Sequence, residues 1–287
     1  MSLSILTNVS AMQTESNLLN SSNAVATAEQ RLSSGLQINS AADDAAGYAI
    51  SEGLTSQING LNEASDNAND AISMVQTASS SLSNVQDMLQ RVYELGVQYN
   101  NGTNSSTDQT DIQDEVNQLT QEIDREQTSS NFNNINLLNG SAGGSGTVTF
   151  QVGADAGDTM AVSFQNVETS ALTTGFSWGV DGANAQAGGT VFDLSDSNAL
   201  ANLTTAIDNI SSQAATLGAV QNRLQYTSDS ISATETNLTS TNSQITDVNM
   251  AQEMTTLTQE QVLEQAGTAM LSQAQSNPQL ILKLLQG

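Results

Sequence analysis

The chain has 287 residues, contains no cysteine and no histidine, and has only 3% aromatic residues. Without cysteine, neither a disulfide nor a thiolate metal site can form. Without histidine, His-based catalytic triads, the HExxH metal motif and imidazole acid–base catalysis are excluded. The few aromatic side chains argue against a thick globular core. We therefore expect no enzyme, and no catalytic residue, cofactor or metal site.

Basic residues are also scarce, because 5 Lys and Arg stand against 30 Asp and Glu, for a net charge of −25. Nucleic acids and anionic membrane surfaces attract proteins through basic patches, so we expect neither as a partner. The acidity has two interpretations. It keeps the chain in solution, or it suits acid surroundings in which neutralised carboxylates no longer repel one another.

Long apolar runs are absent as well. No run approaches the ~18 residues that a membrane-spanning helix requires. The segment MSLSILTNVSAM has no basic stretch followed by a continuous apolar stretch, so it is not a standard signal peptide. If the protein leaves the cell, we expect an export route that does not read a cleavable leader.

The chain does contain long heptad patterns. In the C-terminal half an apolar residue recurs every seven positions, with no proline and only Gly218 as a glycine between the members, which are Leu203, Ile210, Leu217, Leu224, Ile231, Leu238 and Ile245. A second pattern, with alternating steps of three and four, runs from Leu61 to Tyr99. Such patterns predict two long helices with one apolar face each. Since each face needs a partner, we predict that these helices pair as the chain folds back on itself.

Shorter elements are predicted around this pair. Helices are expected over residues 3–34, 45–100, 108–128, 195–247 and 250–286. Gly35 is expected to end the first of them, because glycine readily adopts the left-handed conformation of a helix C-cap. The fold class is thus mainly α, a long antiparallel coiled-coil-like helical rod built from the N- and C-terminal halves, with a small β-hairpin insert.

The hairpin is predicted from alternating apolar residues, which are Val148, Phe150 and Val152, then Met160, Val162 and Phe164. The GADAGD segment between them (153–158) is expected to be a turn, because it lacks the ligand spacing and the closing Glu of a calcium loop. The Gly/Ser-rich segment 141–146 is expected to be a flexible joint. Residues 170–192 are expected to form short strands or loop.

Each terminal helix has an apolar stripe for which the chain offers little cover. One stripe cannot hold a long helix, because fixing its backbone costs about 1–2 kcal/mol per residue. We expect these helices to be marginal alone and to become ordered when copies of the chain pack together. The predicted assembly seam consists of Leu18, Val25, Leu32, Leu257, Leu263, Met270 and Leu271.

Charged side chains supply candidate polar contacts. The pair Asp43 and Asp44 can hold a metal or act on a glycoside, but capping of the following helix is the simpler role. Each arginine can form a forked ion pair with one of the many carboxylates, either as a surface pair of little energy or as a bridge between helices or subunits. The candidate inter-helix or inter-subunit contacts are Arg31, Asp43, Asp44, Arg91, Glu94, Glu115, Arg125, Arg223 and Asp247.

Segments along most of the chain resemble bacterial flagellins in sequence and order. In the N-terminal half they are RLSSGLQINSAADDAAGYAI (31–50), NANDAISMVQTA (67–78), LQRVYELGVQ (89–98), QEIDREQTSSNFNNINLLNG (121–140) and VTFQVGADAGDTM (148–160). In the C-terminal half they are LGAVQNRL (217–224), ITDVNMAQEM (245–254) and QAGTAMLSQAQSNPQLILKLL (265–285). The resemblance covers residues 1–165 and 193–287.

The resemblance implies a secreted, extracellular structural subunit that self-assembles into the helical flagellar filament for swimming motility. It implies terminal helices (1–44 with 248–287) that build an inner tube, a helical rod (45–140 with 193–247), and a hairpin with a short variable insert (141–192). The implied partners are further copies of the chain, the flagellar type III export apparatus and its chaperone, the filament cap and hook-associated proteins.

Two alternatives remain. The hook–filament junction adaptor shares the terminal design and has similar length. Its usual connector contains the pattern Asn-Pro-Ser-Asp-Asp-Pro, whereas this chain has NSAADDAAG (39–47), which favours flagellin. A flagellin with a catalytic insert is the other alternative, and the short insert without histidine argues against it.

Overall fold

The computed structural model describes residues 8–167 and 192–286, with the backbone alone for 277–286. The chain divides into two compact units, one formed by Met1–Gln57 with Thr236–Gly287 and the other by Ile58–Glu235. We call them the terminal unit and the central unit. The predicted boundaries follow helix ends, whereas the division between these units falls inside two long helices.

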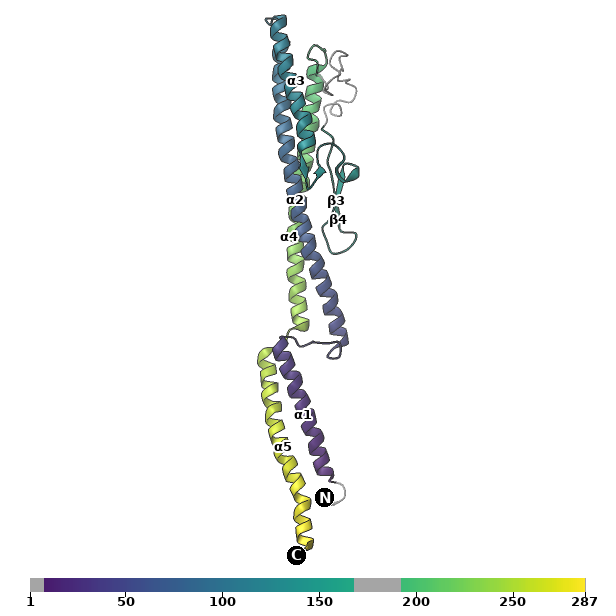
Figure 1. Cartoon of the computed structure of the whole chain (residues 1–287), viewed down its shortest axis with the longest axis vertical. Coiled ribbons are helices and arrows are strands. Elements are labelled where there is room, and N and C mark those ends of the chain that lie inside the picture. The colour runs from purple at the N-terminus through teal and green to yellow at the C-terminus, as the bar shows by residue number, and fades with distance from the viewer. Residues whose placement is uncertain (1–7, 168–191, 287) are drawn as a thin grey trace. The chain divides into compact units, whose positions relative to one another are not determined.

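Helices form most of the described chain (Figure 1). They are α1 (Val9–Ser34), α2 (Ala45–Tyr99), α3 (Ser106–Ser129), α4 (Ala199–Thr246) and α5 (Met250–Gln286). The prediction of a mainly α fold with a small hairpin is confirmed. The observed helix ends lie within two residues of the predicted ones, except that α1 starts at Val9 instead of residue 3 and α4 at Ala199 instead of residue 195. Residues 58–99 of α2 and 199–235 of α4 belong to the central unit.

In the central unit, α2 and α4 pack antiparallel, as the heptad patterns predict. The Cα of Gly96 on α2 lies so close to α4 that a Cβ built there would be 2.8 Å from Cδ2 of Leu200. Further along, Gln86 Nε2 donates a hydrogen bond to Ser211 Oγ at 3.3 Å. The apolar rows of both helices are buried here, and Leu82, Val85, Leu217 and Leu224 are fully inaccessible to solvent. These rows form the centre of a core that also includes residues of α3 and the hairpin.

Helix α3 returns along α2 after a short loop. It begins at a capping box, in which the Asp108 N–H donates to Ser105 Oγ and the Ser105 N–H donates to Asp108 Oδ2. Its inner face adds Ile112, Val116 and Ile123 to the core. The sequence places the start of this helix two residues too late, because the capping serine precedes the aspartates that mark the first turn.

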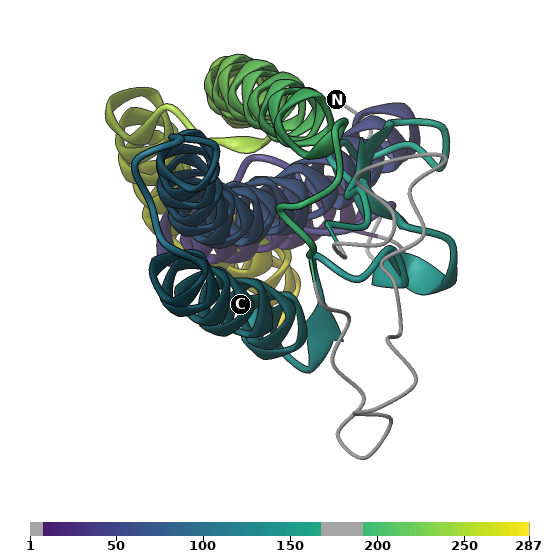
Figure 2. The same cartoon turned by 90° about the horizontal axis from the view of Figure 1, so that it is seen from above.

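Two antiparallel hairpins complete the central unit. β1 (Asn131–Phe132) and β2 (Ile135–Asn136) pair first, with Asn133 and Asn134 at positive φ in the turn. β3 (Thr147–Gln151) pairs with β4 (Thr159–Ser163), and Phe150 is opposite Met160. The hairpin β3–β4 is the predicted one, and it lies beside the helices in both views (Figures 1 and 2).

Three glutamine side chains fix these irregular segments to the helices. The buried Gln213 of α4 donates to the Ser163 carbonyl at 3.1 Å, at the end of β4. Gln127 of α3 donates to Asn166 Oδ1 at 3.1 Å. Gln113 of α3 accepts from the Leu194 N–H at 3.0 Å and donates to the Phe192 carbonyl. Neutral amides thus hold the ends of the segment between β4 and α4.

The prediction of a flexible joint at 141–146 is wrong. This segment contains a short 3-10 helix, η1 (Ala142–Gly144), and Ala142 is completely buried in the central core. Its glycines provide the positive φ that a compact turn requires, which is 63° at Gly143 and 77° at Gly146. The segment expected to be short strands or loop, 170–192, lies outside the described residues apart from Phe192, which is buried.

Candidate assembly surface

The terminal unit is built on α1 and α5, which lie side by side and antiparallel (Figure 1). Asn8 caps α1 by accepting from the Ala11 N–H, and its amide also donates to the Ala274 carbonyl of α5 at 2.8 Å. At the other end of α1, Arg31 faces Glu253 near the start of α5. Gly35 ends α1 at φ 76°, as the sequence predicts.

The contact between α1 and α5 covers their apolar residues only in part. Among the described residues of these two helices, only Ala28 is buried. Five members of the predicted seam are half-buried, namely Leu18, Val25, Leu32, Leu257 and Leu271. The pair is therefore a thin layer without a core of its own.

The other two predicted seam residues lie at the edge of this contact. Leu263 is 46% exposed and Met270 is 61% exposed. Each precedes by one position a residue that faces α1, and one residue corresponds to a rotation of about 100° around a helix. Their side chains therefore lie beside the direct contact with α1 and keep much of their surface exposed.

A groove of about 700 Å³ runs between α1 and α5. Its apolar lining includes Leu18, Leu263, Ala266 and Met270, while Asn17, Asn20 and Glu260 contribute polar groups. Gly267 allows the close approach, since a Cβ there would lie 3.3 Å from Cδ1 of Leu18. The groove is open along its length, so it offers a surface for side chains of a partner more than a closed ligand site.

Exposed apolar side chains concentrate on the same two helices. Large apolar residues with more than 40% exposure on α1 and α5 are Val9, Met12, Leu19, Met250, Met254, Val262, Leu263 and Met270. Helices α2 and α4 have few such residues, for example Val97 and Tyr226. A concentration of exposed apolar side chains on one pair of helices indicates an interaction site.

Of these exposed residues, the predicted seam contains only Leu263 and Met270. A signal for two others was present, because Met12 and Leu19 are seven positions apart and lie outside the row of Leu18 and Val25. This second row gives α1 a second apolar face. The contact of Asn8 with α5 had no such signal, because it joins residues far apart in the sequence.

The connector after α1 and the connector before α5 are hydrogen-bonded to each other. The Gln37 N–H donates to the Thr246 carbonyl at 2.6 Å, and the Val248 N–H donates to the Gly35 carbonyl at 2.9 Å. Leu36 and Asp247 form the bridge between these bonds. The Asp247 carboxylate itself accepts from Ser243 and Thr246, so its side-chain contacts are local.

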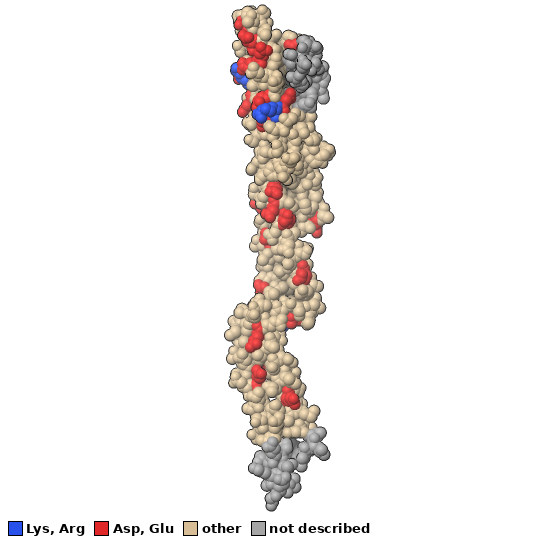
Figure 3. Space-filling model, viewed as in Figure 1, with Lys and Arg blue, Asp and Glu red and all other residues tan. Residues whose placement is uncertain are grey.

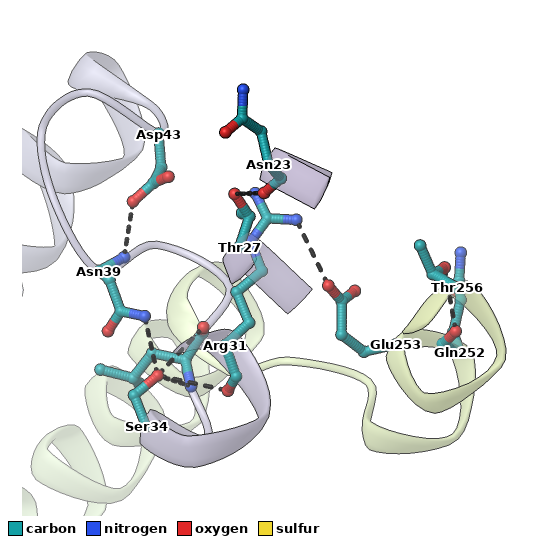
Figure 4. A network of polar contacts seen from close by, with 10 residues as sticks. Asn23, Thr27, Arg31, Ser34, Asn39, Asp43, Gln252, Glu253 and Thr256 are labelled. Atoms are coloured by element: carbon teal, nitrogen blue, oxygen red, sulfur yellow. Dashed lines mark hydrogen bonds and ion pairs between the residues drawn. The ribbon is translucent and has the colours of Figure 1, made fainter. Parts of the chain in front are cut away.

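Arg31, Asp43 and Glu253 belong to a nearby network of polar contacts (Figure 4). Nη1 of Arg31 lies 3.8 Å from Oε1 of Glu253, joining α1 to α5, and the Glu253 side chain is 14% exposed. Asp43 accepts from the Ser40 hydroxyl and from the N–H groups of Asn39 and Ser40. These hydrogen bonds, that of the Ser40 hydroxyl foremost, lower the pKa of the Asp43 carboxyl.

Asp43 and Asp44 therefore bind the backbone close to themselves. Asp44 Oδ1 accepts from the Ala46 N–H at 3.0 Å, at the start of α2. Asp44 thus caps α2, as the simpler interpretation of the pair predicts, whereas Asp43 holds the turn before it and does not cap that helix. Over residues 8–167 and 192–286, no group of three or more acidic side chains is arranged to hold a metal ion.

The other arginines lie in the central unit. Arg91 binds Glu94 on the same helix and Glu115 on α3, with Nη2 to Oε1 at 2.9 Å. Hydrogen bonding to Glu115, then to Glu94, raises the pKa of Arg91. Arg125 pairs with Glu122 along α3, which raises the pKa of Arg125 and lowers that of Glu122. Arg223 is exposed and has no ion pair among the described side chains.

Most of the visible surface is neither acidic nor basic (Figure 3). The basic groups in that view lie beside acidic ones, consistent with the ion pairs of the central unit. Of the helices that the structure describes, none is both long and apolar enough to cross a membrane.

Comparisons with known proteins match both ends of the chain. Residues 5–143 match the bacterial flagellin N-terminal helical region, and residues 200–285 match the bacterial flagellin C-terminal helical region. Flagellin of Bacillus subtilis strain 168 is 40% identical, over 97% of this chain and 98% of that protein. Flagellin of Halalkalibacterium halodurans is 39% identical over the same shares.

A filament protein of a third organism is similarly close. The flagellar filament 33 kDa core protein of Treponema phagedenis is 41% identical, over 97% of this chain and 98% of that protein. Among solved structures, the crystal structure of Bacillus cereus flagellin aligns at 30% identity with a TM-score of 0.47. That alignment covers 58% of this chain and 88% of the other.

Proposed function

Because the chain belongs to the bacterial flagellin family, we propose that the faces of α1 and α5 described above are its assembly surface. The protein is a structural subunit of the extracellular flagellar filament, a polymer of identical chains, and it is not an enzyme. The proposal concerns how this chain supplies the contacts.

The distribution of exposed apolar side chains carries the proposal. The eight large apolar residues exposed on α1 and α5 are about half accessible in the single chain. Burying the remainder of each stabilises by roughly 1 kcal/mol, or about 8 kcal/mol in total. Association costs a comparable free energy through lost translational and rotational freedom. One such contact is therefore weak, whereas a subunit surrounded by several copies gains it repeatedly.

In this proposal residues 1–44 and 248–287 build the inner tube of the filament. Residues 45–140 with 193–247 form the helical rod around it, and residues 141–192 form the hairpin and a short variable insert. Leu18, Val25, Leu32, Leu257 and Leu271 join α1 to α5 within a subunit. Leu263 and Met270 contact the next subunit.

Polar contacts complete the proposed assembly. Arg223 is the best candidate for an ion pair with a neighbouring subunit, because its guanidinium is exposed and the other chains of the filament are strongly acidic. Arg31 links α1 to α5 inside the subunit. Arg91 and Arg125 are occupied by carboxylates of their own chain and contribute less to assembly.

Further partners follow from the same surface. An apolar assembly surface has to stay covered until the subunit reaches the end of the growing filament. We therefore include an export chaperone that covers the terminal helices, the flagellar export apparatus, the filament cap and the hook-associated proteins among the proposed partners.

Salt-induced polymerisation tests the proposal. At about 0.01 M salt the Debye length is roughly 30 Å, so subunits of charge −25 repel one another, and at about 0.15 M it falls to roughly 8 Å. We expect filaments in negative-stain micrographs only after salt or mild acid is added. Polymerisation that is equally fast at very low salt and neutral pH contradicts the charge argument.

A pair of variants at one position tests the surface itself. Leu19→Gln removes an apolar group that is 59% exposed in the single chain, so the folded subunit should remain while polymerisation is lost. Leu19→Met keeps the position apolar and should polymerise like the unchanged chain. If Leu19→Gln also polymerises normally, this face of α1 is not part of the contact.

No observation favours the hook–filament junction adaptor, and the matched relatives named above are flagellins and a filament core protein. The same micrographs distinguish the two functions. A filament protein forms polymers that keep growing as monomer is added, whereas an adaptor protein forms only short rings.

A further inference from the structure

The methionines divide between the two units according to exposure. Of the eight in the chain, Met1 lies outside the described residues. Met12, Met250, Met254 and Met270 belong to the terminal helices and are 49–65% exposed. The central unit holds the other three, Met74 and Met160 at 8% or less and Met88 partly buried against the core.

Methionine is the only sulfur-containing residue in this chain, because cysteine is absent. Its thioether is open to two-electron oxidants such as hydrogen peroxide. The sulfur lone pair attacks one peroxide oxygen, the O–O bond breaks, and the other oxygen leaves as water after taking up the transferred proton. The sulfide becomes a sulfoxide while the peroxide is reduced to water, so an apolar side chain becomes polar.

We propose that Met12, Met250, Met254 and Met270 are oxidation sites that control whether the subunit can assemble. The inference rests on the proposed function, in which α1 and α5 form the contact between copies. In the free subunit the four thioethers are accessible and react. In the filament the same contact covers them and excludes the oxidant.

Oxidation of these residues opposes assembly for a direct reason. A sulfoxide oxygen is a strong hydrogen-bond acceptor, and burying it against apolar side chains leaves it without a donor. Leaving one acceptor unsatisfied costs enough to weaken an association about tenfold. Each subunit has four such positions on the surface that must be covered. The central unit is unaffected, because its core excludes oxidant from Met74 and Met160.

Peptide mass spectrometry of the peroxide-treated monomer tests the reactivity. We expect sulfoxide at Met12, Met250, Met254 and Met270 well before Met74 and Met160. In preformed filaments, the same treatment should leave the four terminal methionines largely unmodified. Equal oxidation of terminal and central methionines in the monomer overturns the inference, as does equal oxidation of the terminal ones in monomer and filament.

Polymerisation of the oxidised monomer tests the consequence. We expect the critical concentration to rise at least about tenfold and to return to its original value after treatment with methionine sulfoxide reductases. In a variant with Met12→Leu, Met250→Leu, Met254→Leu and Met270→Leu, peroxide should leave the critical concentration at the value that this variant has before treatment. Oxidised monomer that polymerises like untreated monomer overturns the inference.

Two controls separate the possible failures. Met160→Leu keeps all four terminal methionines, so peroxide should still raise its critical concentration at least about tenfold. Circular dichroism of the fourfold leucine variant checks that it folds. If untreated protein does not polymerise under any salt condition, the proposed function fails, whereas a failure of the oxidation inference appears only after peroxide.

Discussion

The heptad row of α4 passes through both units and is buried differently in each. In the central unit, the five members from Leu203 to Ile231 are at most 5% exposed. In the terminal unit, Leu238 and Ile245 continue the row and are only half-buried. The repeat is the same, but α3 and the hairpin contribute to the core only in the central unit. A heptad pattern therefore predicts which face of a helix is apolar, while the neighbours determine how deeply that face is buried.

The difference between the units also separates two roles. The central unit has a core formed by residues of several elements and holds its shape within one chain. The terminal unit has two helices in contact, with an apolar surface on each that nothing in the described chain covers. Stability and assembly should therefore respond to different mutations.

Removal of residues 250–287 should separate the two units most clearly. Without α5, the terminal unit loses half of its helix pair and its groove, so we expect no filaments at any salt concentration. The thermal transition of the central unit should remain, because its core contains no residue of α5. Circular dichroism measures the transition and negative-stain microscopy the filaments. A truncated chain that still forms filaments contradicts the assignment of the assembly surface.

Two leucine substitutions, one in each unit, come next. Leu217→Ala removes a fully buried side chain from the central core and should lower the free energy of unfolding by about 2–5 kcal/mol. Leu257→Ala removes a half-buried side chain between α5 and α1 and should cost roughly 1 kcal/mol in the monomer. Denaturant unfolding of the monomers gives both values.

We expect the opposite order for the effects of the two variants on polymerisation. Leu257→Ala should raise the critical concentration for polymerisation more than Leu217→Ala does, provided that both are measured well below their melting temperatures. If Leu217→Ala impairs assembly more under these conditions, the two units do not divide the roles as proposed.

Acid should act on stability and assembly with opposite signs. The N–H and the hydroxyl of Ser105 bond Asp108 and lower its pKa, and hydrogen bonds to Ser40 and Asn39 do the same for Asp43. A carboxyl whose pKa is lowered in the folded state stabilises the fold at pH values above its pKa in the unfolded state, which is about 3.9. This stabilisation is lost as the pH falls through the pKa of the folded state. Protonation of other carboxylates meanwhile reduces the repulsion between subunits.

We therefore expect filaments to form more readily between about pH 7 and pH 4.5, where the hydrogen bonds of Asp108 and Asp43 are intact. Below about pH 4 the melting temperature should fall. In Asp108→Asn the transition of the central unit should depend less on pH in this range, whereas Asp43→Asn should leave that transition unchanged. Melting curves at a series of pH values check both expectations. An equal pH dependence of the central transition in Asp108→Asn and the unchanged chain contradicts the role of this cap.

The smallest expected effects are those of the ion pairs. Arg125 and Glu122 are both well exposed, so Arg125→Gln should leave the melting temperature within experimental error. Arg31→Gln should have a larger effect, because Arg31 and Glu253 are more buried and join α1 to α5. Hydrogen exchange of the terminal helices measures this loss. Equal protection in the two variants contradicts a role of Arg31 in holding the pair.

Local patterns predicted the elements well and the long-range contacts poorly. Gly35 and the alternating residues of β3 and β4 act through neighbours in sequence, so helix ends and the hairpin were predictable. Ala142 has no local signal, because its burial depends on a core built by distant residues. The glycines around it therefore suggested flexibility where the structure has a compact turn.

The contact between α1 and α5 was predictable in part for the same reason. The rows of Leu18 and Leu257 identified the helix faces that meet. The outward position of Leu263 and Met270 depends on how α5 is rotated against α1, which the apolar pattern alone leaves open. Arg31 was expected in an ion pair, but its partner Glu253 lies on a helix more than 200 residues away in sequence.

The glutamines that hold the irregular part of the central unit have a consequence for the conditions under which filaments grow. Gln113, Gln127 and Gln213 attach it through uncharged amides, which neither take up protons in acid nor lose their attraction when salt is added. Shifts in acidity or salinity that strengthen or weaken contacts between molecules should therefore leave these attachments in place. In the proposed filament, the central unit of each subunit therefore keeps its structure while the contacts between subunits change.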